Sequence, residues 1–220
     1  MTKPASPYAV ITLALGSLET NCYIVAERAT GAALCIDPGA DAAAIARRVQ
    51  QEGLTVQGIA LTHGHGDHIG AVARLRKEWG VPVYIHHADA DMLTSATRNL
   101  STMLGAHIVT DAADTIMADA DALTFGSTRV TVLHTPGHTP GGVCYFISAS
   151  APPLLFSGDT LFRREVGRCD LPGGSWPVLQ QSVREKLYVL PGATRVYPGH
   201  GPATTIDEEM RENPHVRSEV

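Results

Sequence analysis

The stretch Leu61–Gly70, "LTHGHGDHIG", places three histidines and one aspartate close together, at His63, His65, Asp67 and His68. Imidazole is a good ligand for zinc, iron and copper, and a carboxylate adds negative charge and can bridge two ions. His63 and His65 lie two apart after an apolar run, so both side chains can point to one side. The pattern therefore indicates a metal site, although a polar loop rich in histidine would have the same composition.

Three further residues follow strand-like runs elsewhere in the chain. They are His138 in "HTPGHTPGG", Asp159 in "LLFSGDTLF" and His200 in "RVYPGHGP". Each directly follows a glycine, which lets the backbone turn sharply beside a ligand and adds no side-chain bulk. Taken singly, a loop histidine is usually a solvated residue, and an aspartate after "SG" is usually a turn residue. Together with the first cluster, these residues are hard to explain as solvated loops.

The number of candidate donors predicts two metal ions. Seven protein donors are too many for one zinc ion, which usually takes four ligands. They fit two ions about 3.5–4 Å apart with a carboxylate and a hydroxide between them. We expect His63, His65 and His138 to hold the first ion. We expect Asp67, His68 and His200 to hold the second, and Asp159 to bridge the two.

The elements that position these residues alternate between strands and helices. We expect strands over Tyr8–Leu13, Cys22–Ala26, Ala33–Ile36, Val56–Leu61, Val81–Ile85, Val143–Ile147, Leu154–Phe156 and Thr194–Tyr197, and two more around a turn at Gly126. We expect helices over Asp41–Gln51, Ile69–Trp79, Ala88–Leu93, Trp176–Leu187 and Thr205–Glu212. The remainder of the middle segment, up to Ala122, is expected to be irregular. This pattern suits two packed sheets with helices outside.

Composition limits the classes of function. A chain of 220 residues with 44% hydrophobic residues can bury a core without a structural metal, so a metal would serve chemistry. A net charge of −5 argues against a nucleic-acid partner. The apolar run Tyr8–Leu15 is too short to span a membrane and has no cleavage site after it. We therefore expect one domain over residues 1–220, located in the cytoplasm and without a membrane partner. The oligomeric state is left open.

The motif "THGHGDH", followed in order by His138, Asp159 and His200, resembles the metallo-β-lactamase superfamily over nearly the whole chain. The resemblance implies an α+β fold, a four-layer αββα sandwich with a dinuclear site at one edge. It also draws attention to Asp37 in "IDPGA", which is similar to the family aspartate that orients a ligand imidazole. Ligating histidines usually donate their other N–H to such an acceptor. The alternative is that Asp37 is a plain turn residue.

Within the superfamily, "SGDTLFRREVGRCDLPGG" and "YPGHGPATTI" resemble the short bacterial members of the glyoxalase II-like group. The resemblance implies hydrolysis of a small-molecule thioester such as S-D-lactoylglutathione, with two divalent ions, most often zinc, with iron or manganese as alternatives. Asp67 would then orient the attacking hydroxide and pass a proton. Arg168 would bind a glutathione carboxylate, unless it is a surface residue paired with Asp170. Tyrosines that contact glutathione in the longer enzymes are replaced here by Asp170 and Pro202, so glutathione recognition carries over less well than metal chemistry.

Three other functions are compatible with parts of the pattern. Persulfide dioxygenases share the upstream histidines and "GR-x-D", and they would hold one iron, here on His63, His138 and Asp159. Their last histidine is followed by Asp-Tyr, whereas this chain continues as "GHGPATT". A nuclease conflicts with the acidic charge and needs further substrate-binding domains. A non-catalytic scaffold is expected to lack ligands, and all seven are present in the sequence.

Overall fold

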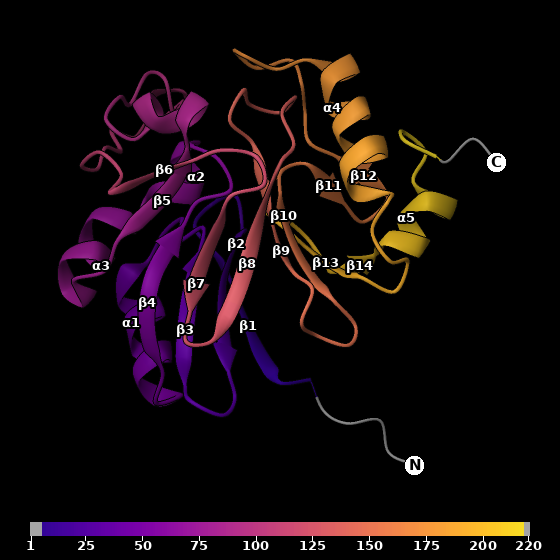
Figure 1. Cartoon of the computed structure of the whole chain (residues 1–220). Coiled ribbons are helices and arrows are strands. Elements are labelled where there is room, and N and C mark those ends of the chain that lie inside the picture. The colour runs from indigo at the N-terminus through magenta and orange to yellow at the C-terminus, as the bar shows by residue number, and fades with distance from the viewer. Residues whose placement is uncertain (1–5, 218–220) are drawn as a thin grey trace.

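The computed structural model describes residues 6–217, which fold into two six-stranded sheets (Figure 1). The ends of the predicted domain, residues 1–5 and 218–220, lie outside the described residues. The first sheet comprises, in spatial order, β1 (Tyr8–Leu15), β2 (Thr20–Glu27), β3 (Ala32–Ile36), β4 (Thr55–Ala60), β5 (Val83–His86) and β6 (Thr115–Met117). Strands β1 to β3 are antiparallel, and β3 to β6 run parallel to one another.

The second sheet is built mainly from the C-terminal half. Its spatial order is β14 (Thr204–Thr205), β13 (Arg195–Pro198), β10 (Leu154–Gly158), β9 (Val143–Ile147), β8 (Thr128–His134) and β7 (Ala122–Phe125). Strand β10 pairs parallel with β13 and antiparallel with β9, which in turn is antiparallel to β8. Strands β8, β10 and β13 therefore point the same way, and their carboxyl ends lie at one edge of the sheet. A small hairpin of β11 (Leu161–Phe162) and β12 (Glu165–Val166) follows β10.

Helices cover the outer face of each sheet, which confirms the four-layer αββα sandwich (Figure 1). Helices α1 (Ala42–Gln51) and α3 (Val72–Trp79) pack on the first sheet. Helix α4 (Trp176–Ser182), its π-helical continuation η3 (Val183–Leu187) and α5 (Ile206–Glu212) pack on the second. Within residues 6–217, no helix has both the length and the apolarity needed to cross a bilayer.

The core lies in three apolar layers because alternate residues of a strand face opposite sides of its sheet. In β2, Ile24 packs toward the helices of the first sheet, whereas its neighbours Tyr23 and Val25 pack between the two sheets. Phe156 of β10 and Tyr145 of β9 meet them from the second sheet. Because both faces of each sheet are covered, the strands read as nearly continuous apolar runs.

The predicted helix 69–79 is wrong in one respect, because the structure divides it. A short helix, α2 (Gly66–Ile69), precedes α3, and the two are separated at Gly70 and Ala71. The Ala71 N–H donates to Pro38 O at 2.9 Å, and a Cβ on Gly70 would lie 2.2 Å from Gly39 O. The break therefore lets the "DPGA" turn approach the histidine motif closely.

The middle segment differs from its predicted irregular conformation. Strand β6 adds a sixth strand beside β5, and two short 3₁₀ helices, η1 (His87–Met92) and η2 (Ser101–Leu104), lie in the same segment. Residues 88–93, predicted as an α-helix, are mostly part of η1. A three-residue strand is too short to show a repeat in its polarity, so only its pairing with β5 identifies it. Asp41, the first residue of the predicted helix 41–51, caps α1 because its side chain accepts a hydrogen bond from Ala44 N at 3.1 Å.

Glu27 at the end of β2 ties the two sheets together and should make stability depend on acid pH. Its carboxylate accepts hydrogen bonds from Thr30, Ser127 and Thr128. These bonds lower the pKa of Glu27 from 4.5 to about 2. A lowered pKa means that the contribution is complete above about pH 4.5 and is lost as the pH falls toward 2.

We therefore expect Glu27→Gln to destabilise the protein at pH 6 and to make little difference near pH 2. Urea unfolding curves across this range would measure the gap between the two proteins. The exposed Glu185 provides the matched control, Glu185→Gln. A gap that stays constant with pH would contradict the assignment.

Candidate metal centre

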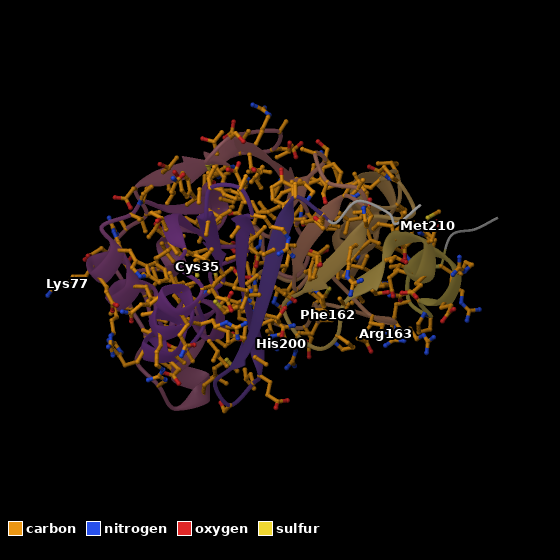
Figure 2. All side chains as sticks on the ribbon, turned by 90° about the horizontal axis from the view of Figure 1, so that it is seen from below. Cys35, Lys77, Phe162, Arg163, His200 and Met210 are labelled. Carbon is orange, nitrogen blue, oxygen red and sulfur yellow. The ribbon has the colours of Figure 1, made fainter. Side chains whose placement is uncertain are left out.

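The predicted donors come together at one edge of the sandwich. His63 follows β4, Asp159 directly follows β10, and His200 follows β13. His138 follows β8, so four different strands lead into the loops that carry the donors. Parallel strands present their carboxyl ends at one edge, and the loops there can carry side chains from distant parts of the chain to one point. A Cβ on Gly199 would lie 2.1 Å from Asp159 Oδ1, so a glycine is needed next to His200. In Figure 2, His200 lies at this edge near Phe162, their ring centroids 6.1 Å apart.

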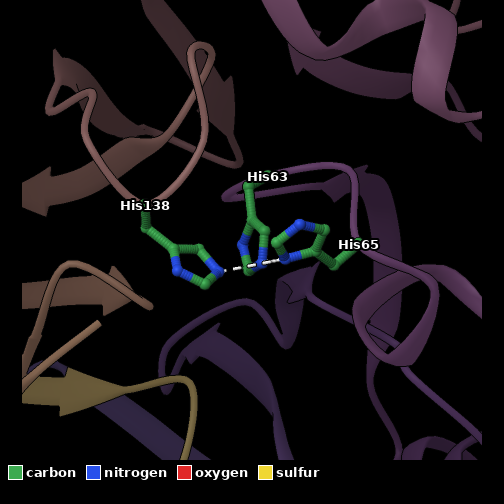
Figure 3. A group of neighbouring side chains, drawn as sticks. All are labelled: His63, His65 and His138. Atoms are coloured by element: carbon green, nitrogen blue, oxygen red, sulfur yellow. Dashed lines mark hydrogen bonds between the residues drawn. The ribbon is translucent and has the colours of Figure 1, made fainter. Parts of the chain in front are cut away.

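Three histidines form the first cluster (Figure 3). Nδ1 of His65 lies 3.1 Å from Nε2 of His63 and 3.0 Å from Nε2 of His138. All three side chains are at least 95% buried. A zinc ion with Zn–N bonds of about 2.0–2.1 Å holds its nitrogen ligands only slightly farther apart than this. The cluster is therefore the size of a metal site.

In His63 and His138, the ring nitrogen that points away from the cluster makes a hydrogen bond, and this bond determines the tautomer of the ring. Nδ1 of His138 lies 2.7 Å from Arg168 O, which can only accept, so this nitrogen carries the proton. Thr62 Oγ1 donates to Asp37, so it accepts from Nδ1 of His63 at 3.1 Å. Both Nε2 atoms are then lone-pair donors. One proton on His65 Nδ1 can point fully at only one of them, so a shared cation satisfies the cluster better than hydrogen bonds do.

A second cluster comprises Asp67, His68 and His200. Asp67 Oδ2 lies 3.5 Å from Nε2 of His68 and 3.4 Å from Nε2 of His200. Nδ1 of His200 donates to Leu18 O at 3.0 Å, which again leaves Nε2 free to face the cluster. The second group thus repeats the arrangement of the first, with a carboxylate in place of one imidazole.

Asp159 lies between the two clusters. Its Oδ1 is 3.4 Å from His68 Nε2, and its Oδ2 is 3.5 Å from His138 Nε2 and 3.6 Å from His200 Nε2. Both His68 Nε2 and Asp159 Oδ1 are buried without a hydrogen-bond partner. Buried polar atoms without partners are rare and costly. Both atoms are placed where they could coordinate a cation, and the donor set fits two divalent ions.

Asp37 contacts the imidazole of His68, one of the candidate ligands. Its Oδ2 accepts from His68 Nδ1 at 3.0 Å and from Thr62 Oγ1 at 2.6 Å, and its Oδ1 accepts from Thr62 N at 2.8 Å. Asp37 also forms a compact group with His63 and His68, whose candidate ligand atoms all lie within 4.8 Å of one another. The residue adopts a left-handed backbone conformation at φ 50° in the "DPGA" turn. The turn and the imidazole contact are therefore both present.

The electrostatics of the first cluster and of Asp159 favour the protonation states that metal ligands need, whereas the pKa of His68 is raised because Asp67, Asp159 and Asp37 outweigh its burial. Burial lowers the pKa of His65 to about 3, and burial together with the neighbouring imidazoles lowers that of His63. Both rings are therefore neutral near pH 7. Burial opposes ionisation of Asp159, but His68 and the other histidines outweigh it and lower its pKa to about 2. Neutral imidazoles and ionised carboxylates are the forms that bind cations.

Two contacts in the site have no signal in the sequence. Thr20 Oγ1 donates to Asp67 Oδ2 at 2.9 Å. Asp89, in η1, is fully buried and joins the two loops that carry the first cluster. It accepts from Gly64 N at 3.1 Å in one loop, and from Thr139 Oγ1 and Gly141 N, both at 2.7 Å, in the other. Asp89 therefore fixes the spacing between His63 and His65 on one side and His138 on the other.

Arg168 lies beside the clusters without entering them. It lines the cavity above them, and its guanidinium makes two bonds to Asp170, at 2.7 and 2.8 Å. Both side chains are more than 60% exposed. The structure thus contains the Arg168–Asp170 ion pair that is expected if Arg168 is a surface residue. Arg168 nevertheless lines the cavity, where it can reach a bound molecule.

Sequence comparison identifies relatives along nearly the whole chain. A family model described as "Metallo-beta-lactamase superfamily" matches residues 15–200. The probable metallo-hydrolase YqgX of Bacillus subtilis is 38% identical over 201 residues, which cover 91% of this chain and 93% of YqgX. The hydroxyacylglutathione hydrolase GloC of Haemophilus influenzae is 30% identical over 208 residues, which cover 92% of this chain and 95% of GloC.

Solved structures give the same fold. The B3 metallo-beta-lactamase BLEG-1 is 40% identical with a TM-score of 0.91, covering 96% of this chain and 100% of its own. TTHA1623, solved in a di-iron-bound form, is 38% identical with a TM-score of 0.83, covering 93% and 99%. ETHE1 from Myxococcus xanthus is 29% identical with a TM-score of 0.74, covering 94% and 84%.

Proposed function

The chain belongs to the metallo-beta-lactamase superfamily, and we propose that it hydrolyses a thioester at a centre of two divalent metal ions. The observation that carries the proposal is the pair of three-residue clusters with Asp159 between them. One cluster alone would serve a single ion. Two clusters that share a carboxylate suit two-metal hydrolysis, in which both the attacking and the leaving atoms are stabilised.

The residues divide between the ions as their positions suggest. His63, His65 and His138 would hold the first ion. Asp67, His68 and His200 would hold the second, with Asp159 between them. Asp37 would fix the His68 ring and its tautomer, a role that typically changes metal affinity or activity about 10–100-fold.

When bound, two divalent ions would supply Lewis acidity toward the thioester carbonyl and would lower the pKa of a bound water toward neutrality. The chain's own residues place the reactants. Asp67 would orient the attacking water and take up its proton, with Thr20 holding one of its carboxylate oxygens. The water oxygen joins the carbonyl carbon, the carbon–sulfur bond breaks, and Asp67 would return the proton to the departing thiolate. His63 and His65 remain neutral throughout.

Support for a thioester comes from the glyoxalase II-like segments of the sequence and from the relative named hydroxyacylglutathione hydrolase. The metal is proposed to be zinc, with iron as the first alternative because a 38% identical structure is di-iron-bound. The second candidate function is a one-iron persulfide dioxygenase, which the structural similarity to ETHE1 favours.

Metal analysis followed by parallel assays tests the proposal. We expect two metal ions per chain in protein purified without chelators, and hydrolysis of S-lactoylglutathione or another thioester that stops on chelation. Nitrocefin should be included, because a 40% identical structure is called a beta-lactamase. One iron per chain with oxygen consumption on glutathione persulfide would overturn the proposal in favour of the dioxygenase.

Arg168→Ala tests the predicted carboxylate contact. We expect KM for a glutathione thioester to rise about threefold to tenfold, because an exposed guanidinium contributes a modest charge-assisted bond. KM for an uncharged aryl thioester should hardly change. Equal effects on both substrates would show that Arg168 serves only its pair with Asp170.

A further inference from the structure

A large cavity opens directly above the metal centre. Its volume is about 1050 Å³, and Asp67, Asp159 and His200 lie among its lining residues. The lactoyl group has only three carbons and is polar. A cavity of this size is at the upper end of what small-molecule sites offer. Most of the cavity volume must therefore be filled by parts of the substrate that lie away from the scissile carbon–sulfur bond.

The mouth of the cavity is apolar and exposed. Leu18, Met103, Leu104 and Trp176 all line it, with exposed fractions of 46%, 70%, 50% and 39%. They make up half of the large hydrophobic residues that are exposed within residues 6–217. Single exposed apolar residues are ordinary, but a group of them at one opening marks a binding surface. Phe162 also lines the cavity and lies beside His200 (Figure 2).

The charged side chains around this mouth are already paired. Among the described residues that line the cavity, Arg168 is the only lysine or arginine, and Asp170 binds its guanidinium at two points. His215 Nε2 lies 2.8 Å from Glu165 Oε1. Glutathione has two carboxylates, so a site made for its polar backbone would need more cationic groups than this one offers.

We propose that the substrate is a thioester with a sizeable apolar group, aliphatic or aromatic, that lies on Met103, Leu104 and Trp176 during hydrolysis. This inference rests on the proposed function. The apolar group can belong to the acyl part or to the thiol part, because the same surface would bury either one. Burial of each methylene stabilises the bound state by about 0.8 kcal/mol when complete, which corresponds to about fourfold in binding.

Two substrate series test the proposal and distinguish the two sources. The first varies the acyl group on glutathione from acetyl and lactoyl to butanoyl and octanoyl. The second keeps acetyl and varies the thiol from cysteamine to benzyl and octyl thiols. We expect kcat/KM to rise about twofold to fourfold per methylene in one series, which is at least about sixtyfold over the roughly six methylenes that separate its ends.

The double variant Met103→Ser/Leu104→Ser should flatten that series. Both side chains are half or more exposed, so the fold should tolerate the change. Val189→Ser is the matched control, because Val189 is 71% exposed and lies away from the cavity. It should preserve the whole series.

Binding provides a readout that does not need turnover. S-octylglutathione, a thioether that cannot be hydrolysed, should change the fluorescence of Trp176 and bind at least about tenfold more tightly than S-methylglutathione. Trp176→Phe identifies the signal, because Trp79 is the only other tryptophan.

The outcomes separate the inference from the function on which it rests. Hydrolysis with flat series and equal binding of both thioethers would overturn the inference and leave the thioesterase standing. Tight octyl binding without hydrolysis of any thioester would retain the apolar site and overturn the thioesterase. If the double variant changes only the oligomeric state in light scattering, the surface serves self-association and the inference is wrong.

Discussion

Asp159→Asn should reduce kcat/KM for thioester hydrolysis by about 10²–10³-fold, the loss expected when a preorganised electrostatic group is removed from a site. Asp159 lies between the two clusters, with its two oxygens 3.4 Å from Nε2 of His68 and 3.5 Å from Nε2 of His138. Asparagine keeps the size but has one acceptor oxygen and no charge. We therefore expect the variant to retain at most one tightly bound ion per chain after dialysis.

Metal content by mass spectrometry and kinetics on the same samples provide the measurement. Asp207→Asn is the control, because Asp207 is exposed in the first turn of α5 and far from the clusters. Circular dichroism of the metal-free proteins shows whether the variant folds. A folded Asp159→Asn protein with two ions and full activity would show that the two clusters do not share this carboxylate.

Three of the candidate donors could be predicted because a local signal precedes each of them. A strand-like apolar run ends, a glycine follows, and a histidine or aspartate comes next, at His138, Asp159 and His200. The alternation of elements then requires these ends to meet at one edge, which the parallel β8, β10 and β13 achieve. Long elements such as α1 were predicted nearly to the residue, since their periodicity and cap are both in the sequence.

What could not be predicted depends on contacts between distant segments. Asp89 and Asp91 lie two apart in "HHADADML", and nothing local distinguishes them. Only the fold buries Asp89 between two loops and leaves Asp91 exposed with Arg98. The break before α3 similarly depends on the approach of Pro38. The apolar mouth was also missed, because Met103 and Leu104 have no repeat that relates them to Trp176.

Because Asp89 is buried between the two loops whereas Asp91 is exposed, Asp89→Asn tests how the first cluster is held in place. Asp89 accepts three hydrogen bonds, two on Oδ2 and one on Oδ1, so every partner of its two oxygens is a donor. An asparagine can accept at one of these oxygens but must turn its NH₂ group toward a donor at the other. The buried mismatch should cost about 1–3 kcal/mol of folding stability.

The loss should also appear in metal binding, because the two loops that Asp89 joins carry all three histidines of the first cluster. We expect the affinity for the first ion to fall about 10–100-fold, as for other groups that orient metal ligands. Competition with a chromophoric chelator measures this, and chemical denaturation of the metal-free protein measures stability separately. Thr139→Val, which removes one of the three bonds, should show a smaller change in both, and Asp91→Asn should show neither. If Asp89→Asn is less stable but binds both ions as tightly as the parent protein, Asp89 supports the fold and does not position the ligands.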